Sequence, residues 1–310
     1  LERAWMRQPA LLATAAPLPK ERPVLLSLVP TQLQRLMAEP AAAAWLRRLA
    51  LIWVGGAPLS AELAGRARAV GLRLAPCYGA TETAAMVTAM DRAGVRIAVV
   101  SSHEALSDPI NGNHVTASVI AAYPDRFRGW LVANPLYPQQ IAKDLEKFEV
   151  WQAQGFVGFK IHPGWHQYPL TGPNYRPMFE YAEERAIPLL SHTWGEDPFC
   201  GSALVRRIVE AYPSIPFLAG HAIHGEWDQG ISIARKHPNL YLELTAAYSV
   251  NGVLEHLVAG VGADRILFGD DLPWFDPMHG IGCVLCARIG DDDRHAILHT
   301  NAERLFGIKM

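Results

Sequence analysis

The sequence is poor in cysteine and has no long apolar run. Four cysteines in 310 residues do not make the disulfide framework of a small secreted protein. Every uninterrupted apolar stretch is shorter than the about 18 residues that a membrane-spanning helix needs. The formal net charge is −2, so the chain carries no basic footprint for nucleic acid or anionic lipid. We therefore expect a reduced, cytoplasmic protein without a nucleic-acid or membrane partner.

Histidine and aspartate are missing from the first part of the chain. Residues 1–90 carry ten Lys and Arg against five Glu, and all twelve histidines lie after them. Apolar residues make up 50% of the chain and charged residues 19%, which excludes disorder by composition. The uneven distribution predicts two domains of different origin. We place them at residues 1–90 and 91–310.

The second domain shows a regular alternation of strand-like and helix-like segments. Apolar runs begin about every 30 residues, which is the length of a strand–helix–strand unit, at Arg96, Gly129, Phe156, Ile187, Ile215, Leu240 and Arg265. Helical periodicity fills the gaps, for example over 139–154 and 202–212. Nearly continuous apolar strands predict a parallel sheet covered on both faces. The fold class is therefore α/β, and seven strands are one short of a closed barrel.

Polar side chains stand where several of these strands end. Lys160 and His162 end one strand, His192 and His221 end the next two, and Asp270 and Asp271 end the last. In a barrel, that end of the strands is the face on which catalytic sites are built. Two imidazoles and a carboxylate suit a divalent metal such as zinc, which lowers the pKa of a bound water. Asp271 would ligate the metal and shuttle the proton.

The same segments resemble the amidohydrolase-related (amidohydrolase 2) family over residues 90–310. The matching pieces are GFVGFKIHPGW, LLSHTWG, FLAGHAIHG, RILFGDDLPW and ILHTNAERLFGI. The resemblance implies a (β/α)8 TIM-barrel-like domain that hydrolyses or non-oxidatively decarboxylates a small carboxylate-bearing compound. It also implies a divalent metal, zinc or manganese, at a site formed by His192, Asp271 and Lys160. His221 and Asp271 would be the catalytic residues.

One feature of that family is lacking. Its first strand ends in His-x-His, which supplies two metal ligands, whereas here no histidine precedes His103 and no His-x-His occurs. We therefore expect a barrel without its native first strand. Because even the groups that orient metal ligands are worth about 10–100-fold in affinity, the loss of two ligands should weaken metal binding much further. An impaired or inactive barrel stays open as an alternative.

Aromatic residues follow the polar strand ends closely. Trp165, Trp194 and Trp274 each lie a few residues beyond one of them, and with His162 they are candidate substrate-binding residues. The alternative is that each tryptophan caps the core. We expect a small-molecule substrate as the partner, and a homo-oligomer stays open.

Residues 24–88 resemble a different family, the adenylate-forming ligases, and most closely the o-succinylbenzoate–CoA ligases. The matching pieces are SLVPTQLQRLM, LIWVGGAPLS and LRLAPCYGATETAAMVT. The resemblance implies an AMP site bordered by Gly55, Gly56 and Tyr78, with Thr81 at the phosphate and Glu82 on Mg²⁺. The phosphate loop and the C-terminal lysine of such ligases are missing, so a remnant of an AMP-forming acyl-CoA ligase is the alternative function.

The junction between the two parts allows two arrangements. Residues 72–78 read as a strand and residues 81–93 as a helix, directly before the strand at Arg96. One hypothesis is that residues 72–78 replace the missing first barrel strand, with Glu82 at the catalytic face. The competing hypothesis is a separate α/β lobe beside an open, seven-stranded partial barrel.

Overall fold

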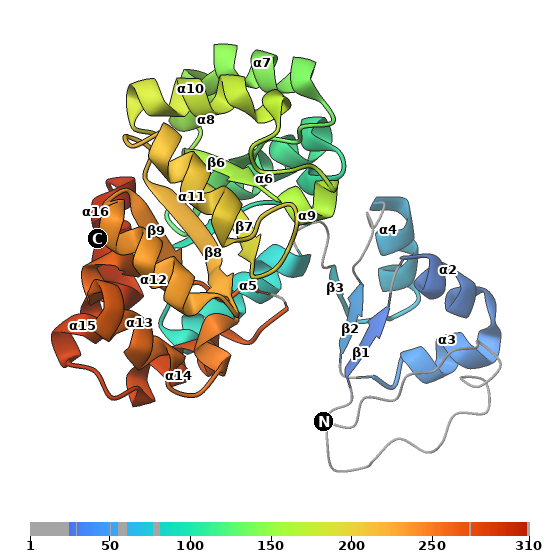
Figure 1. The fold of residues 1–310 in the computed structure, drawn as a ribbon. Helices are drawn as coiled ribbons and strands as arrows, with labels where there is room; N and C mark the ends of the chain where they lie inside the picture. Colours follow the sequence, from blue (N-terminus) through green and yellow to red (C-terminus); the bar gives the residue numbers. More distant parts are fainter. Residues whose placement is uncertain are drawn as a thin grey trace. The chain divides into compact units, whose positions relative to one another are not determined.

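The architecture is that of two units of unequal size, each with its own parallel sheet. The computed structural model describes residues 25–28, 30–49, 51–54, 61–76, 81–272 and 274–308. Its contacts divide the chain into Leu1–Thr88 and Ala89–Met310. The boundary falls within helix α5 (Thr81–Ala93), and the two units are drawn from blue to red in Figure 1.

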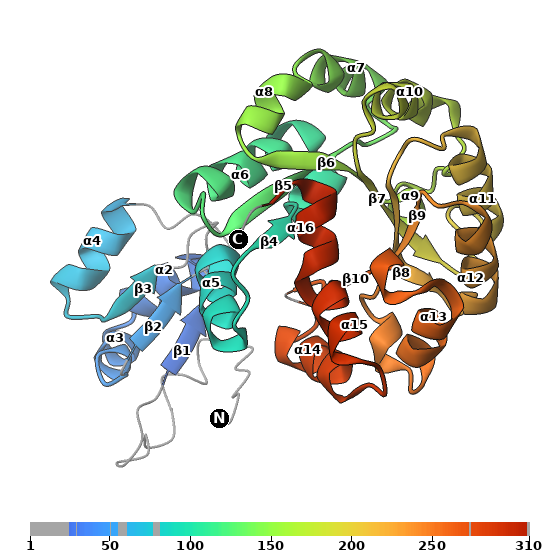
Figure 2. The same ribbon diagram turned by 90° about the vertical axis from the view of Figure 1, so that its left-hand side faces the viewer.

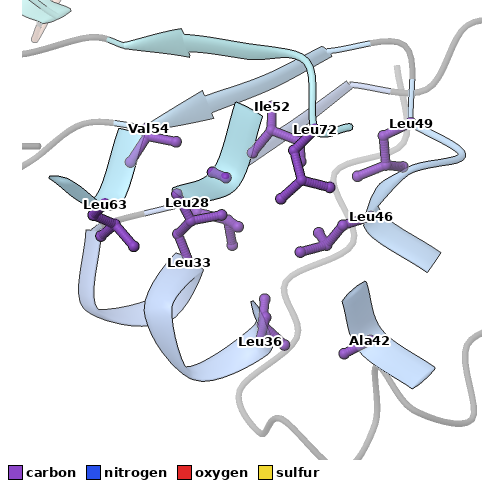
Figure 3. Close-up of a cluster of buried hydrophobic side chains, with 11 residues drawn as sticks. Leu28, Leu33, Leu36, Ala42, Leu46, Leu49, Ile52, Val54, Leu63 and Leu72 are labelled. Carbon is purple, nitrogen blue, oxygen red and sulfur yellow. The ribbon is translucent and has the colours of Figure 1, made fainter. Parts of the chain in front are cut away.

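The first unit has three parallel strands in the order β1–β2–β3. They are β1 (Leu25–Leu28), β2 (Leu51–Val54) and β3 (Leu74–Pro76), and the helices between them are α2 (Pro30–Ala38), α3 (Pro40–Leu46) and α4 (Ala61–Ala69). Proline begins both α2 and α3, where a missing N–H costs no helical hydrogen bond. Figure 3 shows leucines from the helices pointing at Ile52 and Val54 of β2, and this cluster is the core of the unit.

The structure contradicts the hypothesis that residues 72–78 replace a barrel strand. Within that segment β3 is hydrogen-bonded to β2, and it belongs to the three-stranded sheet. Leu72 is 4% exposed and packs in the same cluster as Leu28 and Ile52. Strand β3 therefore follows its apolar partners into the sheet of the first unit, and the separate α/β lobe stays a prediction.

The second unit is built on seven parallel strands that pair in chain order. They are β4 (Ala98–Val100), β5 (Phe127–Val132), β6 (Phe156–Ile161), β7 (Leu189–Trp194), β8 (Phe217–His224), β9 (Leu240–Glu243) and β10 (Ile266–Leu267). The sheet curls into a half-barrel, as Figure 2 shows. The predicted α/β class and the partial barrel are confirmed.

Helices cover the outer face of this sheet, since α6, α8, α11 and α12 contact β5, β6, β7 and β8 in turn (Figure 2). The longer helices are α6 (Pro109–Ala122), α7 (Pro138–Glu146), α8 (Phe148–Ala153), α10 (Arg176–Arg185), α11 (Ser202–Ala211), α12 (Trp227–Lys236), α13 (Val253–Val261), α14 (Pro277–Cys286) and α16 (Asn301–Phe306). Shorter turns are η1 (His103–Leu106), α9 (Pro163–His166), η2 (Pro173–Tyr175), η3 (Ala247–Ser249), η4 (Ala263–Arg265), α15 (Asp291–His295) and the π-helical turn η5 (Ala296–Thr300). None of the described helices is long and apolar enough to span a bilayer.

The inner face of the half-barrel is covered by the C-terminal helix. Trp130 of β5 meets Phe306 of α16 edge-on, with ring centroids 5.3 Å apart. Leu190 and Tyr241 belong to the same apolar cluster. Because side chains alternate along a strand, His192 and Glu243 lie on this face too, two residues nearer the carboxyl ends. The apolar cluster thus lies directly beneath these polar residues, toward the amino ends of the strands.

Candidate active site

Three histidines from neighbouring strands meet at the carboxyl ends of the sheet. His162 directly follows β6, His192 lies on β7 and His221 lies on β8. The rings of His162 and His192 are stacked with centroids 3.9 Å apart. His192 Nδ1 lies 2.9 Å from His221 Nε2. The strand-end histidines predicted from the sequence therefore form one centre, which we call the histidine centre.

The hydrogen bonds assign the tautomer of each imidazole. His221 Nδ1 lies 3.1 Å from the Thr245 carbonyl oxygen, which only accepts, so Nδ1 carries the proton. The Nε2 atom of neutral His221 then accepts, and His192 Nδ1–H donates to it. His162 Nδ1 accepts from the Trp165 backbone N–H at 3.1 Å, which leaves its proton on Nε2. The centre thus has one N–H at His162 and one lone pair at His192 Nε2.

Burial keeps the imidazoles of His162 and His192 neutral. It lowers the pKa of His192 to about 2, and the nearby charges of His162, His221 and Lys160 act in the same direction. Burial and the Lys160 ammonium lower the pKa of His162 to about 3. Neutral imidazoles are the form that accepts hydrogen bonds and ligates metals. The Lys160 ammonium is thus one of the charges that lower the pKa of both His162 and His192.

The backbone of β8 is strained where it carries His221. Three successive residues have left-handed backbones, with φ of 63° at His221, 50° at Ala222 and 52° at Ile223. Such residues cost about 1–3 kcal/mol each and persist only when their surroundings fix them. Here Thr193 Oγ1 donates to the Gly220 carbonyl and accepts the Ile223 N–H at 3.1 Å. The strain turns His221 toward His192.

A buried carboxylate supports the same strand. Glu243 is 9% exposed and accepts the His221 backbone N–H at 3.3 Å and the Thr245 backbone N–H at 3.0 Å. Its Oε1 atom fills the space in which a Cβ at Gly269 would lie. Glu243 therefore fixes the positions of β8 and of the segment after β10 at once.

Further acids lie beyond β10. Burial raises the pKa of Asp270, and the nearby carboxylates of Glu243 and Asp271 raise it further. Asp271 is exposed and has a left-handed φ of 54°. Burial and the nearby carboxylates, of which Asp270 has the largest effect, also raise the pKa of Tyr248, whose hydroxyl is buried without a hydrogen-bond partner in the described part of the chain.

The three candidate tryptophans lie around the histidines. Trp194 is 5.6 Å from His221 between ring centroids, and Trp165 is 6.2 Å from His162. His103 stands edge-on to Trp165 at 5.1 Å and to Trp274 at 6.1 Å. All three tryptophans are exposed, by 50% at Trp165, 39% at Trp194 and 72% at Trp274. Exposed aromatic faces of this kind suit a flat, apolar ring.

The donor set does not amount to a metal centre. Catalytic metal sites hold at least three protein ligands. Among the residues that the structure describes, no three His, Cys, Asp or Glu side chains are grouped as they would be around an ion. His192 and His221 meet each other, but no contact joins Asp271 to them in the described structure. The assignment of Lys160, His192 and Asp271 as ligands stays a prediction, and we derive no step through a metal.

The ligase-like site falls largely outside the described residues. The structure does not describe Gly55, Gly56 and Tyr78. Thr81 and Glu82 begin α5, and their side chains are outside the description as well.

Sequence reasoning missed two residues of the site. His103 follows β4 just as the other histidines follow their strands, so the same pattern marks it. Tyr248 carries no such signal, since it lies in a turn after β9 and reaches the acids only through the fold.

With this geometry in place, the comparisons with known proteins define the family. The amidohydrolase family profile matches residues 72–308, and the chain belongs to this family. A profile of AMP-binding enzymes matches residues 4–105.

Several proteins to which the chain is similar are decarboxylases. The chain is 24% identical to the gamma-resorcylate decarboxylase of Polaromonas over 283 residues, covering 71% of this chain and 86% of that protein. A Polaromonas dihydroxybenzoic acid decarboxylase solved with bound manganese has a TM-score of 0.58 at 20% identity, covering 72% and 85% of the two chains. A 5-carboxyvanillate decarboxylase from Novosphingobium aromaticivorans, complexed with manganese, has a TM-score of 0.60 at 16% identity, covering 93% and 96%. These relatives do not favour the ligase alternative.

Proposed function

We propose that the second unit removes the carboxyl group of an aromatic carboxylic acid without oxidation, at the histidine centre. The observation that carries the proposal is the meeting of His162, His192 and His221 beside exposed tryptophans at the catalytic end of the strands. Family membership and the decarboxylase relatives support decarboxylation over the hydrolysis of an amide or lactone.

The reaction needs a proton and no oxidant. The proton adds to the ring carbon that bears the carboxylate, the carbon–carbon bond breaks, and its electron pair restores the aromatic ring as CO2 leaves. Trp165 and Trp194 would hold the ring, and the Nε2–H of His162 would donate to the carboxylate. His221 would orient His192 through the hydrogen bond between His221 Nε2 and His192 Nδ1, and Asp271 would deliver the proton.

A divalent cation belongs to the proposal only as a weakly held ion. The manganese in two solved relatives supports a divalent cation and gives no particular support to zinc. His192 Nε2 offers the one free lone pair of the histidine centre, which falls short of the three protein ligands of a complete set. We expect the purified protein to lose Mn²⁺ on dialysis, which metal analysis measures, whereas retention of one ion per chain would contradict this expectation.

The test is direct. The protein is incubated with gamma-resorcylate and with 5-carboxyvanillate, with and without added Mn²⁺, and the phenolic product is separated by chromatography. We expect product with the wild type and a loss of at least about 100-fold in His221→Ala and Asp271→Ala. His256→Ala is the matched control, because His256 lies on α13 and pairs with Asp228. No product from either acid under both conditions would refute the proposal.

A further inference from the structure

A second histidine cluster lies outside the candidate active site. His295, His299 and Glu303 follow one another at intervals of four residues along α15, η5 and α16. His295 Nδ1 lies 3.1 Å from His299 Nε2, and His299 Nδ1 lies 2.6 Å from Glu303 Oε1. His295 is exposed, and the side chains of His299 and Glu303 are 38% and 29% exposed. Solvent and small ions therefore reach this cluster.

The backbone between the two histidines is a π-helical turn. Residues Ala296–Thr300 make this turn, and the Ile297 carbonyl within it accepts the Phe268 N–H at 3.0 Å. Phe268 directly follows β10, so the sheet holds the turn in place. Single π-helical turns within α-helices are rare and occur often at functional sites.

The tautomer of His299 leaves a lone pair facing His295. Glu303 only accepts, so His299 Nδ1 carries the proton and donates to it. The lone pair on His299 Nε2 then points at His295 Nδ1. Histidines that ligate metals commonly donate their other N–H to a carboxylate in this way, which fixes the ring.

The spacing of the two nitrogen atoms suits a chelated ion. With zinc–nitrogen bonds of about 2.0–2.1 Å in tetrahedral geometry, two ligating nitrogens lie about 3.3 Å apart. The observed separation of 3.1 Å is close to this value, so chelation requires the His295 proton to move from Nδ1 to Nε2 and the two rings to turn toward the ion, with little change in the spacing of the nitrogens. Imidazole ligands select zinc, copper and nickel over magnesium and calcium.

We propose that His295 and His299 chelate a divalent transition-metal ion, with zinc as the test case. Glu303 orients His299 as a positioning residue, and water completes the coordination. The grouping of two protein ligands agrees with the absence of any three-ligand cluster among the described residues. The site does not depend on the proposed decarboxylation, since it shares no residue with the histidine centre.

The experiment titrates Zn²⁺ into the full chain by calorimetry. We expect a site at His295 and His299, distinct from any weak binding at the histidine centre, whose affinity falls at least about 100-fold in His299→Ala and about 10–100-fold in Glu303→Gln. His295→Asn changes an exposed side chain and should show the same loss as His299→Ala without disturbing the packing. His256→Ala and His192→Ala should keep the site, and Mg²⁺ should give no binding heat.

Two results would overturn the proposal. One is the absence of Zn²⁺ binding to the wild type. The other is binding that survives in both His299→Ala and His295→Asn, including the case in which His192→Ala alone removes it.

Discussion

At the scale of single residues, the carboxylate of Glu243 leaves no room for a side chain at residue 269. We predict that Gly269→Ala lowers the free energy of unfolding by about 1–3 kcal/mol, because the new methyl group displaces a buried, hydrogen-bonded carboxylate. Urea denaturation measures the change.

The matched control is Gly282→Ala on α14. A Cβ at residue 282 meets no atom within 4 Å, and alanine suits a helix interior better than glycine. This control should stabilise the protein by about 0.5–1 kcal/mol. Equal effects of the two substitutions would contradict the crowding argument.

A buried acid on α7 gives a prediction about pH. Burial raises the pKa of Asp144 above its unfolded value, although Gln140 donates to it at 3.0 Å. A raised folded pKa means that stability is lost as the pH rises through that pKa. Asp144→Asn should therefore raise the melting temperature at pH 7, and the gain should shrink as the pH falls toward about 4.

Asp108 provides a control of opposite sign. The Asn111 backbone N–H donates to its carboxylate at 3.1 Å and lowers the pKa of Asp108. Its contribution is present above the unfolded pKa and is lost as the pH falls. Asp108→Asn should lower the melting temperature at pH 7. A higher melting temperature in both variants would show that the change follows from removal of a charge alone and not from the burial of Asp144.

Strand-end position predicted the histidine centre, because parallel strands bring their carboxyl ends to one edge. It did not predict which hydrogen bonds the histidine side chains make at that edge. The direct hydrogen bond between His192 and His221 depends on the left-handed backbone of β8, which no local pattern marks. Nor does the sequence give the partners of Glu243, because the alternation of side chains along a strand fixes only the face on which Glu243 lies.

At the scale of elements, apolar runs predicted all seven strands of the half-barrel but not the sheet to which β3 belongs. The sequence pattern of a strand–helix–strand unit is the same in either sheet. The burial of Leu72 beside Ile52 shows to which sheet β3 belongs. Residues 139–154, expected as one helix, form α7 and α8 with a break at Lys147, whose φ of −114° is not helical. Residues 291–306 likewise contain the π-helical turn.

The contact between α16 and β5 gives a prediction at this scale. Phe306→Ala removes the edge-on contact with Trp130 and should cost about 1–3 kcal/mol in the free energy of unfolding, since the ring is partly buried. Urea denaturation measures the loss. Leu285→Ala on α14, where the side chain is 53% exposed, should change stability by less than about 0.5 kcal/mol. Similar losses in both variants would contradict a specific role for α16.

At the scale of the whole molecule, two separate cores predict two unfolding transitions. Leu46 is 1% exposed in the core of the first unit, and Leu267 is 3% exposed in the core under the histidine centre. Each Leu→Ala substitution should remove about 2–5 kcal/mol from its own unit. Scanning calorimetry of the full chain should show each variant shifting a different transition. A single transition that both variants shift equally would contradict independent units.

The half-barrel is not closed, since β10 and β4, the two outermost strands of the described sheet, do not pair with each other. Each of these has a hydrogen-bonded neighbour on one side alone within that sheet, so thermal fraying of the barrel begins there. His192 lies on the middle strand, and His162 and His221 belong to the strands beside it. Backbone amides should therefore exchange with solvent fastest in the outermost strands β4 and β10 and slowest in the strands that carry the imidazoles. The histidines then keep their mutual spacing while the outermost strands open and close.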